Sequence, residues 1–223
     1  VDGNGLLVTA SAKTGNSRKP QIIIDSNGYY HCVWHDDGTL RSQILYSKFN
    51  GVAWSNPELV TDSYFNLRNP SLSVDSQNKI WVVYEDTSWG RTEISCSVKD
   101  DAGWNPKIRL TNAKSEKENP NIIVNSFDDV HVVWEDNRNG NKEIFWANWS
   151  NNSKAWISSA QFGKDTPIMQ RIENDLYLIG AISFKHPKLA FMYPNMWLTC
   201  EGFYETTNKS IIYLSFMNID NGQ

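Results

Sequence analysis

The chain lacks both a long hydrophobic run and a long basic run. Its most apolar stretch, Leu176–Ile182, is far shorter than the roughly 20 residues that a membrane-spanning helix needs. Its longest basic run is the pair Arg18-Lys19, and its formal net charge is −4. We therefore expect neither a membrane span nor a nucleic-acid partner.

Cysteine is scarce as well. The three cysteines, Cys32, Cys96 and Cys200, are odd in number and have no CxxC spacing. This pattern indicates neither a zinc site nor a disulfide framework. We expect Cys32 and Cys96 to be small apolar core residues, and we predict no metal and no cofactor.

A helical period is missing too, and the composition favours sheets. The 223-residue chain is 40% hydrophobic and 13% aromatic, with ten tryptophans. This length allows one large domain with a substantial core. Aromatic residues suit sheet faces and ligand stacking better than long helices.

What the chain does have is a repeat of about fifty residues, marked by Pro20, Pro70 and Pro120. Each proline is followed by a bulky aromatic residue after fourteen positions, an aspartate after sixteen and an isoleucine after twenty-four. These residues are Trp34, Tyr84 and Trp134; Asp36, Asp86 and Asp136; and Ile44, Ile94 and Ile144. A period near fifty residues is typical of a repeat architecture.

Each copy divides into four short extended segments separated by turns. In the second copy the first three segments are residues 71–75, 79–84 and 93–98, and the first turn is rich in Asp, Ser and Asn. Four short antiparallel strands per copy predict an all-β fold, a β-propeller of four-stranded antiparallel blades. The bulky aromatic residue of each copy should then be buried between sheets.

We predict a single β-propeller domain over residues 1–223. Residues 1–19 should supply the fourth strand of the closing blade, because Leu7–Thr9 matches Leu59–Thr61. Pairing this strand with the C-terminal portion would remove an exposed sheet edge. The expected result is four blades, as a complete ring or as part of a larger one. The other predicted boundaries are three regular blades and a divergent blade or blades: residues 20–69, 70–119, 120–166 and 167–223.

Two registers compete in the C-terminal third. In one, Pro187 begins the fourth blade, and an insertion of about fifteen residues precedes it. In the other, Pro167 begins the blade, Asn174-Asp175 is its first turn, and Leu176–Ser183 is its second strand. Spacing favours the second register and closure of the ring favours the first, so both stay open.

The copies resemble the repeats of the sialidase-like β-propellers, also called BNR or Asp-box propellers. The resemblance covers residues 18–165 and is carried best by Pro70–Asp86, with Trp104 after it. In that family the turn after the third strand reads Ser-x-Asp-x-Gly-x-x-Trp. Here the boxes are degenerate, because Phe49 and Lys99 stand where the Asp belongs. The boxes are structural in that family, so the resemblance implies a fold rather than a chemistry.

A sialidase resemblance also implies an arginine triad for a substrate carboxylate. Arg41, Arg91 and Arg138 should lie in loops at one end of three neighbouring blades, and guanidinium groups suit carboxylates. They recur at nearly the same place in each copy, however, beside the repeated aspartate. A residue needed at one centre should break the repeat, so we interpret these arginines as loop braces.

The other catalytic residues that the resemblance implies are an Asp acid/base and a Tyr nucleophile beside a Glu. Tyr84-Glu85 has the residue types of the nucleophile pair, but Glu85 recurs as Glu135. This repetition indicates a scaffold role, and we assign no catalytic residue.

Residues that break the repeat on the same loop face are better candidates; they are His35, Tyr64, Phe65, Ser88 and Trp89. Trp89 has Thr39 and Asn139 as counterparts, so the repeat does not require it. We predict a binding site in which a partly exposed Trp89 stacks on a sugar ring beside Tyr64 and Arg91, with Arg41 and Arg138 on the same face. Alternatively, Trp89 covers an adjacent blade or a partner surface. His35 is expected to be a solvated or hydrogen-bonded loop residue.

The sequence therefore favours a non-catalytic propeller that binds glycan or protein through its loop face. Acceptor sequons at Asn148, Asn151 and Asn208 are compatible with a secreted or cell-surface protein. Two alternatives stay open: an exo-sialidase-like glycoside hydrolase or a piece of one, and a structural module of a larger assembly. Nothing in the sequence indicates the oligomeric state.

Overall fold

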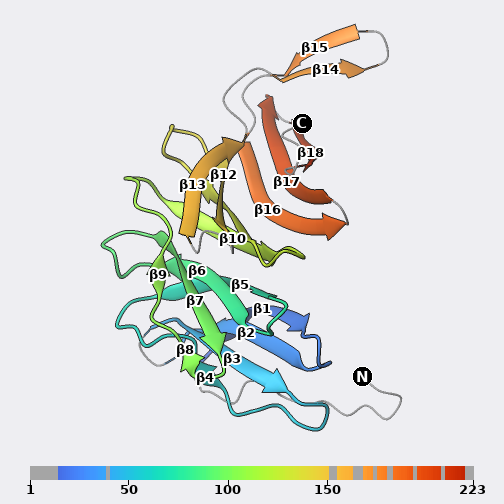
Figure 1. Ribbon diagram of the computed structural model, residues 1–223. Helices are drawn as coiled ribbons and strands as arrows, with labels where there is room; N and C mark the ends of the chain where they lie inside the picture. Colours follow the sequence, from blue (N-terminus) through green and yellow to red (C-terminus); the bar gives the residue numbers. More distant parts are fainter. Residues whose placement is uncertain are drawn as a thin grey trace. The chain divides into compact units, whose positions relative to one another are not determined.

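The computed structural model describes residues 15–38 and 41–149 in full (Figure 1). At residue 150 and in the strands between residues 155 and 218 it describes the backbone alone. The one exception is Trp156, whose side chain is also described. Every regular element in this part of the chain is a strand, which confirms the all-β class. The described residues include no helix that could span a membrane.

Three antiparallel sheets match the three predicted blades. In blade 1 the strand order is β1 (Ser17–Ile24), β2 (Tyr30–Asp36), β3 (Gln43–Phe49) and β4 (Glu58–Leu59). Blade 2 has β5 (Leu67–Val74), β6 (Ile80–Asp86) and β7 (Glu93–Asp100), and two short strands pair with β7, namely β8 (Gly103–Trp104) and β9 (Ile108–Arg109). Blade 3 has β10 (Lys117–Val124), β11 (Val130–Asp136), β12 (Glu143–Ser150) and β13 (Ala155–Phe162).

The first strand of each blade begins three residues before its proline, and not after it as the sequence predicted. The residue before each proline has a positive φ: 53° at Lys19, 49° at Asn69 and 53° at Asn119. The strand register shifts at the same place in all three blades. Proline cannot donate to the strand ladder, so the strand continues past it only through a β-bulge. Ser17–Lys19 therefore belong to blade 1, and residues 1–14, including the predicted closing strand, lie outside the described residues.

The C-terminal strands follow the register that begins at Pro187. They form a hairpin, β14 (Ile168–Ile172) with β15 (Asp175–Ile179), and a separate sheet of β16 (Ser183–Met192), β17 (Asn195–Thr206) and β18 (Lys209–Asn218). The register of β16 shifts between Lys185 and Lys188, so Pro187 lies within a shift like those at the first three prolines. The β14–β15 hairpin supplies the insertion of that register. In the register from Pro167, β15 would pair with β14 and also with the following strand. The pairing with β14 is present, but β16 belongs to a separate sheet.

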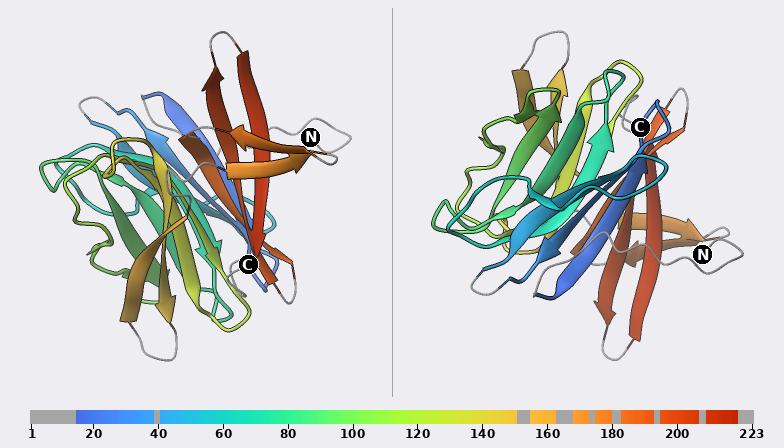
Figure 2. Two further views of the ribbon diagram at one scale, coloured as in Figure 1. Left: turned by 90° about the horizontal axis from the view of Figure 1, so that it is seen from above. Right: turned by 90° about the horizontal axis from the view of Figure 1, so that it is seen from below.

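The chain consists of two compact units, Val1–Asn112 and Ala113–Gln223, which we describe separately. In the first unit, β5 of blade 2 packs on β1, β2 and β3 of blade 1 (Figure 2). In the second, β16 contacts β10, β11 and β12 in the same way. Within each unit, the later sheet thus stacks on the earlier one through its first strand, which covers an apolar face of the earlier sheet.

The core confirms the predicted role of the bulky aromatic residues. Trp34, Tyr84 and Trp134 are all buried. In the first unit, side chains of both blades form one hydrophobic cluster: Val33, Ile44, Tyr46, Val60, Leu67, Leu72, Ile80, Val82 and Tyr84. Cys96 is a buried core residue, as predicted, and Cys32 is half-buried; both are free thiols. Cys200 lies outside the residues whose side chains are described.

Candidate binding site

The candidate site lies on the loop between β6 and β7. Asp86 ends β6, Glu93 begins β7, and the two residues are paired across the strands. Between them the chain turns tightly: Ser88 N donates to Asp86 Oδ1 (2.9 Å), and Gly90 N donates to Thr87 O (3.3 Å). Gly90 has a φ of 81°, which L-residues with side chains adopt rarely. This turn places the side chain of Trp89 at the end of the blade.

The indole of Trp89 is fixed but not covered, with 38% of the residue exposed. Its Nε1 donates to Ser95 Oγ (3.2 Å). The guanidinium carbon of Arg109 lies 4.9 Å from the ring centroid and Lys107 Nζ lies 5.5 Å from it. Both distances are within the range of a cation–π interaction. The structure thus confirms the expected partial exposure of Trp89.

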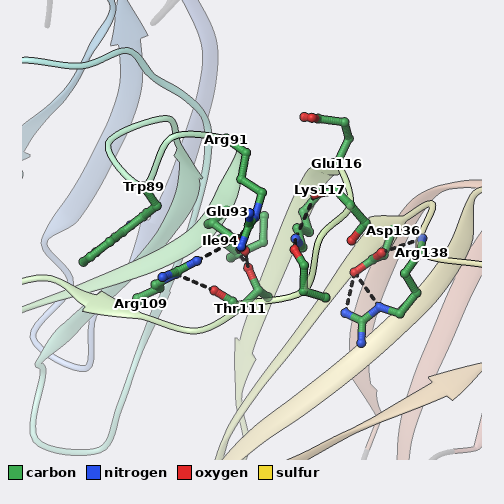
Figure 3. Close-up of polar contacts among 12 residues, drawn as sticks. Trp89, Arg91, Glu93, Ile94, Arg109, Thr111, Glu116, Lys117, Asp136 and Arg138 are labelled. Carbon is green, nitrogen blue, oxygen red and sulfur yellow. Dashed lines mark hydrogen bonds and ion pairs between the residues drawn. The ribbon is translucent and has the colours of Figure 1, made fainter.

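The cations near Trp89 are held by two carboxylates that are fully buried. Glu93 Oε1 accepts from Arg91 Nε (2.7 Å) and Arg109 Nη2 (2.8 Å), and Glu93 Oε2 accepts from Thr111 Oγ1 (2.5 Å) (Figure 3). Arg109 Nε also donates to the carbonyl of Thr111 (2.8 Å). Charge-assisted bonds of this kind are stronger than neutral ones. The position of each guanidinium is therefore set by Glu93.

The second buried carboxylate, Asp86, holds Lys107. Asp86 Oδ2 accepts from Lys107 Nζ (2.7 Å) and Ser95 Oγ (3.0 Å), and Lys107 Nζ also donates to Ser88 Oγ (2.8 Å). Burial alone would raise the pKa of Asp86, but the bonds from Lys107 and Ser88 more than offset it and hold the pKa below its usual range. Asp86 is therefore ionised at neutral pH.

Three cations, Arg91, Lys107 and Arg109, contact the two carboxylates. The side chains of Arg91, Lys107 and Arg109 are each partly exposed. Among the described residues, Arg91 uses only its Nε, so both terminal nitrogens can donate to a ligand. An aromatic face with guanidinium and ammonium donors at its rim can bind a sugar ring and orient its polar substituents.

Two members of the cluster, Lys107 and Arg109, were missed in the sequence analysis. Arg109 pairs with Ser95 as Leu59 pairs with Leu45, so the counterpart of Arg109 in blade 1 is Leu59. The counterpart of Lys107 is accordingly Pro57. Both residues break the repeat as Trp89 does. The signal was present in the fourth segment, where Leu59-Val-Thr is replaced by Arg109-Leu-Thr.

The remaining predicted site residues lie elsewhere or have other partners. The cations over Trp89 come from Arg109 and Lys107 rather than from Arg91, which is linked to Arg109 through Glu93. Tyr64 is paired with Arg41, whose guanidinium carbon lies 4.8 Å from the ring centroid. Arg138 belongs to the second unit and is not part of this cluster.

Arg91 and Arg138 are both loop braces, as interpreted from the sequence, but only Arg138 is bonded to the repeated aspartate. Arg138 Nε donates to Asp136 Oδ2 (3.0 Å), as expected. Arg91 is bonded to Glu93 and not to Asp86, whose cation is Lys107. Arg138 is also not the counterpart of Arg91, because it stands two residues after its aspartate, where blade 2 has Ser88.

Tyr84 and Glu85, which have the residue types of a sialidase nucleophile and its glutamate, are part of the scaffold. Tyr84 is fully buried, its hydroxyl lies 2.8 Å from Ser97 Oγ, and burial raises its pKa far above the usual value. Glu85 Oε1 accepts from Asn69 Nδ2 (2.7 Å), and Glu135 Oε1 accepts from Asn119 Nδ2 (2.8 Å) in the same way. This repeated bond braces the bulges before Pro70 and Pro120.

His35 is a strand residue, so the expectation of a loop residue was wrong. It lies in β2, it is buried, and its Nδ1 accepts from Asn69 N of blade 2 (3.3 Å). Burial lowers its pKa, which favours the neutral imidazole. The expectation that it forms a hydrogen bond is confirmed. The described residues contain no group of three or more His, Cys, Asp or Glu that could hold a metal ion.

Comparison with known proteins supports the fold. No protein-family model and no curated protein matches the chain. The Trypanosoma rangeli sialidase, solved with sialic acid, matches with a TM-score of 0.60 and 11% identity over 92% of this chain and 37% of that one. The GH93 alpha-L-arabinofuranosidase of Fusarium graminearum, solved with arabinobiose, matches with a TM-score of 0.67 and 12% identity over 94% of this chain and 64% of that one.

A third similar structure is the Penicillium chrysogenum alpha-L-arabinanase with arabinobiose, with a TM-score of 0.66 and 14% identity over 95% of this chain and 65% of that one. The chain thus spans between 37% and 65% of the length of these three structures. At such low identity the similarity concerns the fold alone. The chain is a β-propeller, and the resemblance of its repeats to sialidase-like propellers is confirmed at that level.

Proposed function

We propose that this propeller is a non-catalytic glycan-binding protein and that Trp89 is the centre of its site. The observation that carries the proposal is the partly exposed indole, which one hydrogen bond and two cations hold in place. Trp89, Lys107 and Arg109 all break the repeat, so the propeller fold itself does not require them. A preorganised aromatic face loses little conformational freedom when a ligand stacks on it.

The charges suggest which sugars would bind best. The side chains of Arg91 and Lys107 are partly exposed, so their remaining donors can bind sugar hydroxyls or an acidic substituent. A ligand that carries a carboxylate or sulfate should bind more tightly than its neutral analogue. Because the cations are partly exposed, added salt should weaken that preference.

Two features favour binding over hydrolysis at this site. A general acid for glycoside hydrolysis needs a raised pKa and access to the glycosidic oxygen. Asp86 is fully buried and its pKa is lowered, while Glu93 is fully buried and bonded to two arginines. Neither carboxylate has the access that a catalytic acid requires.

A glycoside hydrolase is the alternative that the fold similarity favours, since the similar structures include a sialidase and two arabinan-degrading enzymes. Chromogenic sialosides and arabinosides would test it directly. We expect no cleavage by the wild-type protein. Cleavage that is abolished by Arg41→Ala would instead support the hydrolase.

The binding proposal is tested with a glycan array, followed by calorimetric titration of the best glycan. Trp89→Ala should weaken binding at least tenfold and lower the free energy of unfolding by no more than about 1 kcal/mol, as expected for an exposed loop residue. The matched control is Phe127→Ala, which removes a 76% exposed aromatic residue from a turn of blade 3. Equal affinity of wild type and Trp89→Ala would contradict the proposal.

We also propose that the protein acts outside the cell or on its surface, where glycans are abundant. The three sequons support this localisation unequally. Asn148 lies within β12 and is half-buried, so it is a poor acceptor for a glycan. Asn151 and Asn208 lie outside the described residues. Mass spectrometry of protein secreted by eukaryotic cells should therefore find no glycan on Asn148.

A further inference from the structure

We infer that the loop of Tyr64 and Phe65 forms a second aromatic platform, so that the ligand is an oligosaccharide chain rather than a single terminal sugar. This inference rests on the proposed function of Trp89 and extends it to a neighbouring loop. One sugar of the ligand would stack at Trp89, and sugars further along the same oligosaccharide would contact Tyr64 and Phe65.

The second platform is the most exposed aromatic surface of the first unit. Tyr64 is 80% exposed and Phe65 is 49% exposed. The guanidinium carbon of Arg41 lies 4.8 Å from the ring centroid of Tyr64, and Tyr64 still keeps most of its surface exposed. The arrangement repeats that of Trp89, where an aromatic ring also lies beside a guanidinium.

The repeat gives no structural reason for these aromatic side chains. Counted from the prolines, the counterparts of Tyr64 and Phe65 in the next copy are Lys114 and Ser115. The same connection between blades is therefore made without aromatic residues. Exposed aromatic residues that the fold does not need are candidates for ligand contact.

The loop is held in place on the side of blade 1. Gln43 Nε2 donates to Phe65 O (3.1 Å), and Ser42 N donates to Asn66 Oδ1 (3.0 Å). Phe65 N donates to Ser63 Oγ (3.1 Å). These bonds fix the backbone next to the exposed rings, so part of the ordering cost of binding is met before the ligand arrives.

The same loop is bonded to the loop of Trp89. Thr87 N and Thr87 Oγ1 both donate to Asn66 O (3.2 Å each). These bonds extend the ladder in which Leu67 of β5 pairs with Asp86 of β6. Tyr64 stands three residues before Leu67 and Trp89 three residues after Asp86. The two platforms thus extend from the same end of two adjacent strands, each at most about 11 Å along the chain from its strand.

Two platforms on one rigid unit predict a dependence on chain length. Once one sugar is bound at Trp89, a connected sugar is present at the second platform at a high effective concentration. Wild-type affinity should therefore rise at least tenfold from the disaccharide to a hexasaccharide of the array hit. A shorter ligand, bound at Trp89 alone, should not depend on Tyr64.

The test is a titration of di-, tetra- and hexasaccharides of that glycan against wild type, Tyr64→Ala, Trp89→Ala and the control Phe127→Ala. Tyr64→Ala should remove the gain with length and leave the disaccharide affinity unchanged, while Trp89→Ala should weaken all three ligands. Affinity that is flat with length, or a Tyr64→Ala effect that is equal at every length, would overturn the second platform and leave the Trp89 site standing. If Trp89→Ala has no effect on any glycan, both proposals fail.

Discussion

Three equivalent residues, Asp25, Asp75 and Asn125, close the first hairpin of each blade. The Oδ1 atom of each accepts from the backbone nitrogens two and four residues later, at 2.9 to 3.0 Å. The other side-chain terminus of each residue reaches an aromatic side chain six residues on, which is His31, Trp81 or His131. A short polar residue thus satisfies the turn and anchors a side chain of the second strand.

His31 makes this arrangement sensitive to pH. It is buried between Asp25 Oδ2 (3.1 Å from Nε2) and Tyr46 Oη (2.6 Å from Nδ1). Burial is the largest effect on its pKa and lowers it below the ordinary value of 6.5, although Asp25 opposes the shift. The unfolded chain therefore binds this proton more readily than the folded one. The contribution to stability is complete above pH 6.5 and is lost as the pH falls below it.

We predict that the free energy of unfolding is lower at pH 5.0 than at pH 7.5 and that His31→Gln reduces the difference. Glutamine can still donate to Asp25 but does not titrate. Urea denaturation at the two pH values measures the effect. Asp25 stays ionised over this range, because the hydrogen bonds from Tyr29 and His31 outweigh burial and hold its pKa below the usual value. Identical pH dependence in the two proteins would show that His31 does not contribute.

Glu93 is the residue on which the geometry of the candidate site depends. Glu93→Ala removes a buried carboxylate that two arginines and Thr111 share, and we expect it to cost roughly 3 kcal/mol of unfolding free energy. It should also weaken glycan binding, because Arg91 and Arg109 lose their fixed positions. Thermal denaturation and titration measure the two effects. The exposed Glu116 provides the control, since Glu116→Ala should change neither by a measurable amount.

The convergence of Lys107 and Arg109 on Trp89 illustrates what sequence reasoning at the residue scale cannot supply. The repeat identified Trp89 as unusual, and the structure confirms that it is partly exposed. Finding its partners requires the register of β9, a strand of two residues with too little pattern to align by itself. The pairing of Ser95 with Arg109 supplies that register.

At the scale of elements, the strands were predicted well and their first residues were not. Short apolar segments separated by polar turns after each proline indicated strands, and they are present. Three earlier residues join each first strand because the bulge lets the ladder continue past a proline. Proline is normally read as the start of a strand, and nothing in the sequence marked the bulge. The backbone geometry at Lys19, Asn69 and Asn119 was therefore not foreseen.

The bulge at Lys19 leads to a prediction about glycine. Lys19 has a φ of 53°, which costs about 1–2 kcal/mol in a residue with a Cβ atom and almost nothing in glycine. We expect Lys19→Gly to leave the melting temperature unchanged or raise it. The neighbouring Arg18→Gly should lower it, because Arg18 has ordinary strand geometry and an ion pair with Asp37. Calorimetry of both variants tests this, and a destabilisation by Lys19→Gly that equals that of Arg18→Gly would show that the bulge is not strained.

At the scale of the whole molecule, the repeat predicted the architecture because each blade depends on its neighbours. A four-stranded sheet with two apolar faces is stable only when another sheet covers it, so regular spacing along the sequence implies stacking in space. The divergent C-terminal part shows the limit of this reasoning. There the spacing of prolines favoured one register, whereas the separate sheet of β16, β17 and β18 and the register shift around Pro187 follow the other, because the β14–β15 hairpin interrupts the period.

The cost of losing a buried aromatic residue is the sharpest test of the stacked architecture. Trp134 is fully buried in the centre of blade 3, where its ring stacks near that of Phe145 with centroids 6.2 Å apart and its Nε1 donates to Asp136 Oδ2 (3.4 Å). Trp134→Ala would leave a large cavity, while Asp136 Oδ2 would keep its bond from Arg138. We expect it to lower the free energy of unfolding by roughly 3–5 kcal/mol, measured by urea denaturation with circular dichroism. The control is Phe127→Ala, which removes an exposed aromatic side chain from the same blade. It should lower the free energy of unfolding by less than about 1 kcal/mol. Similar costs for the two variants would mean that Trp134 does not lie between packed sheets.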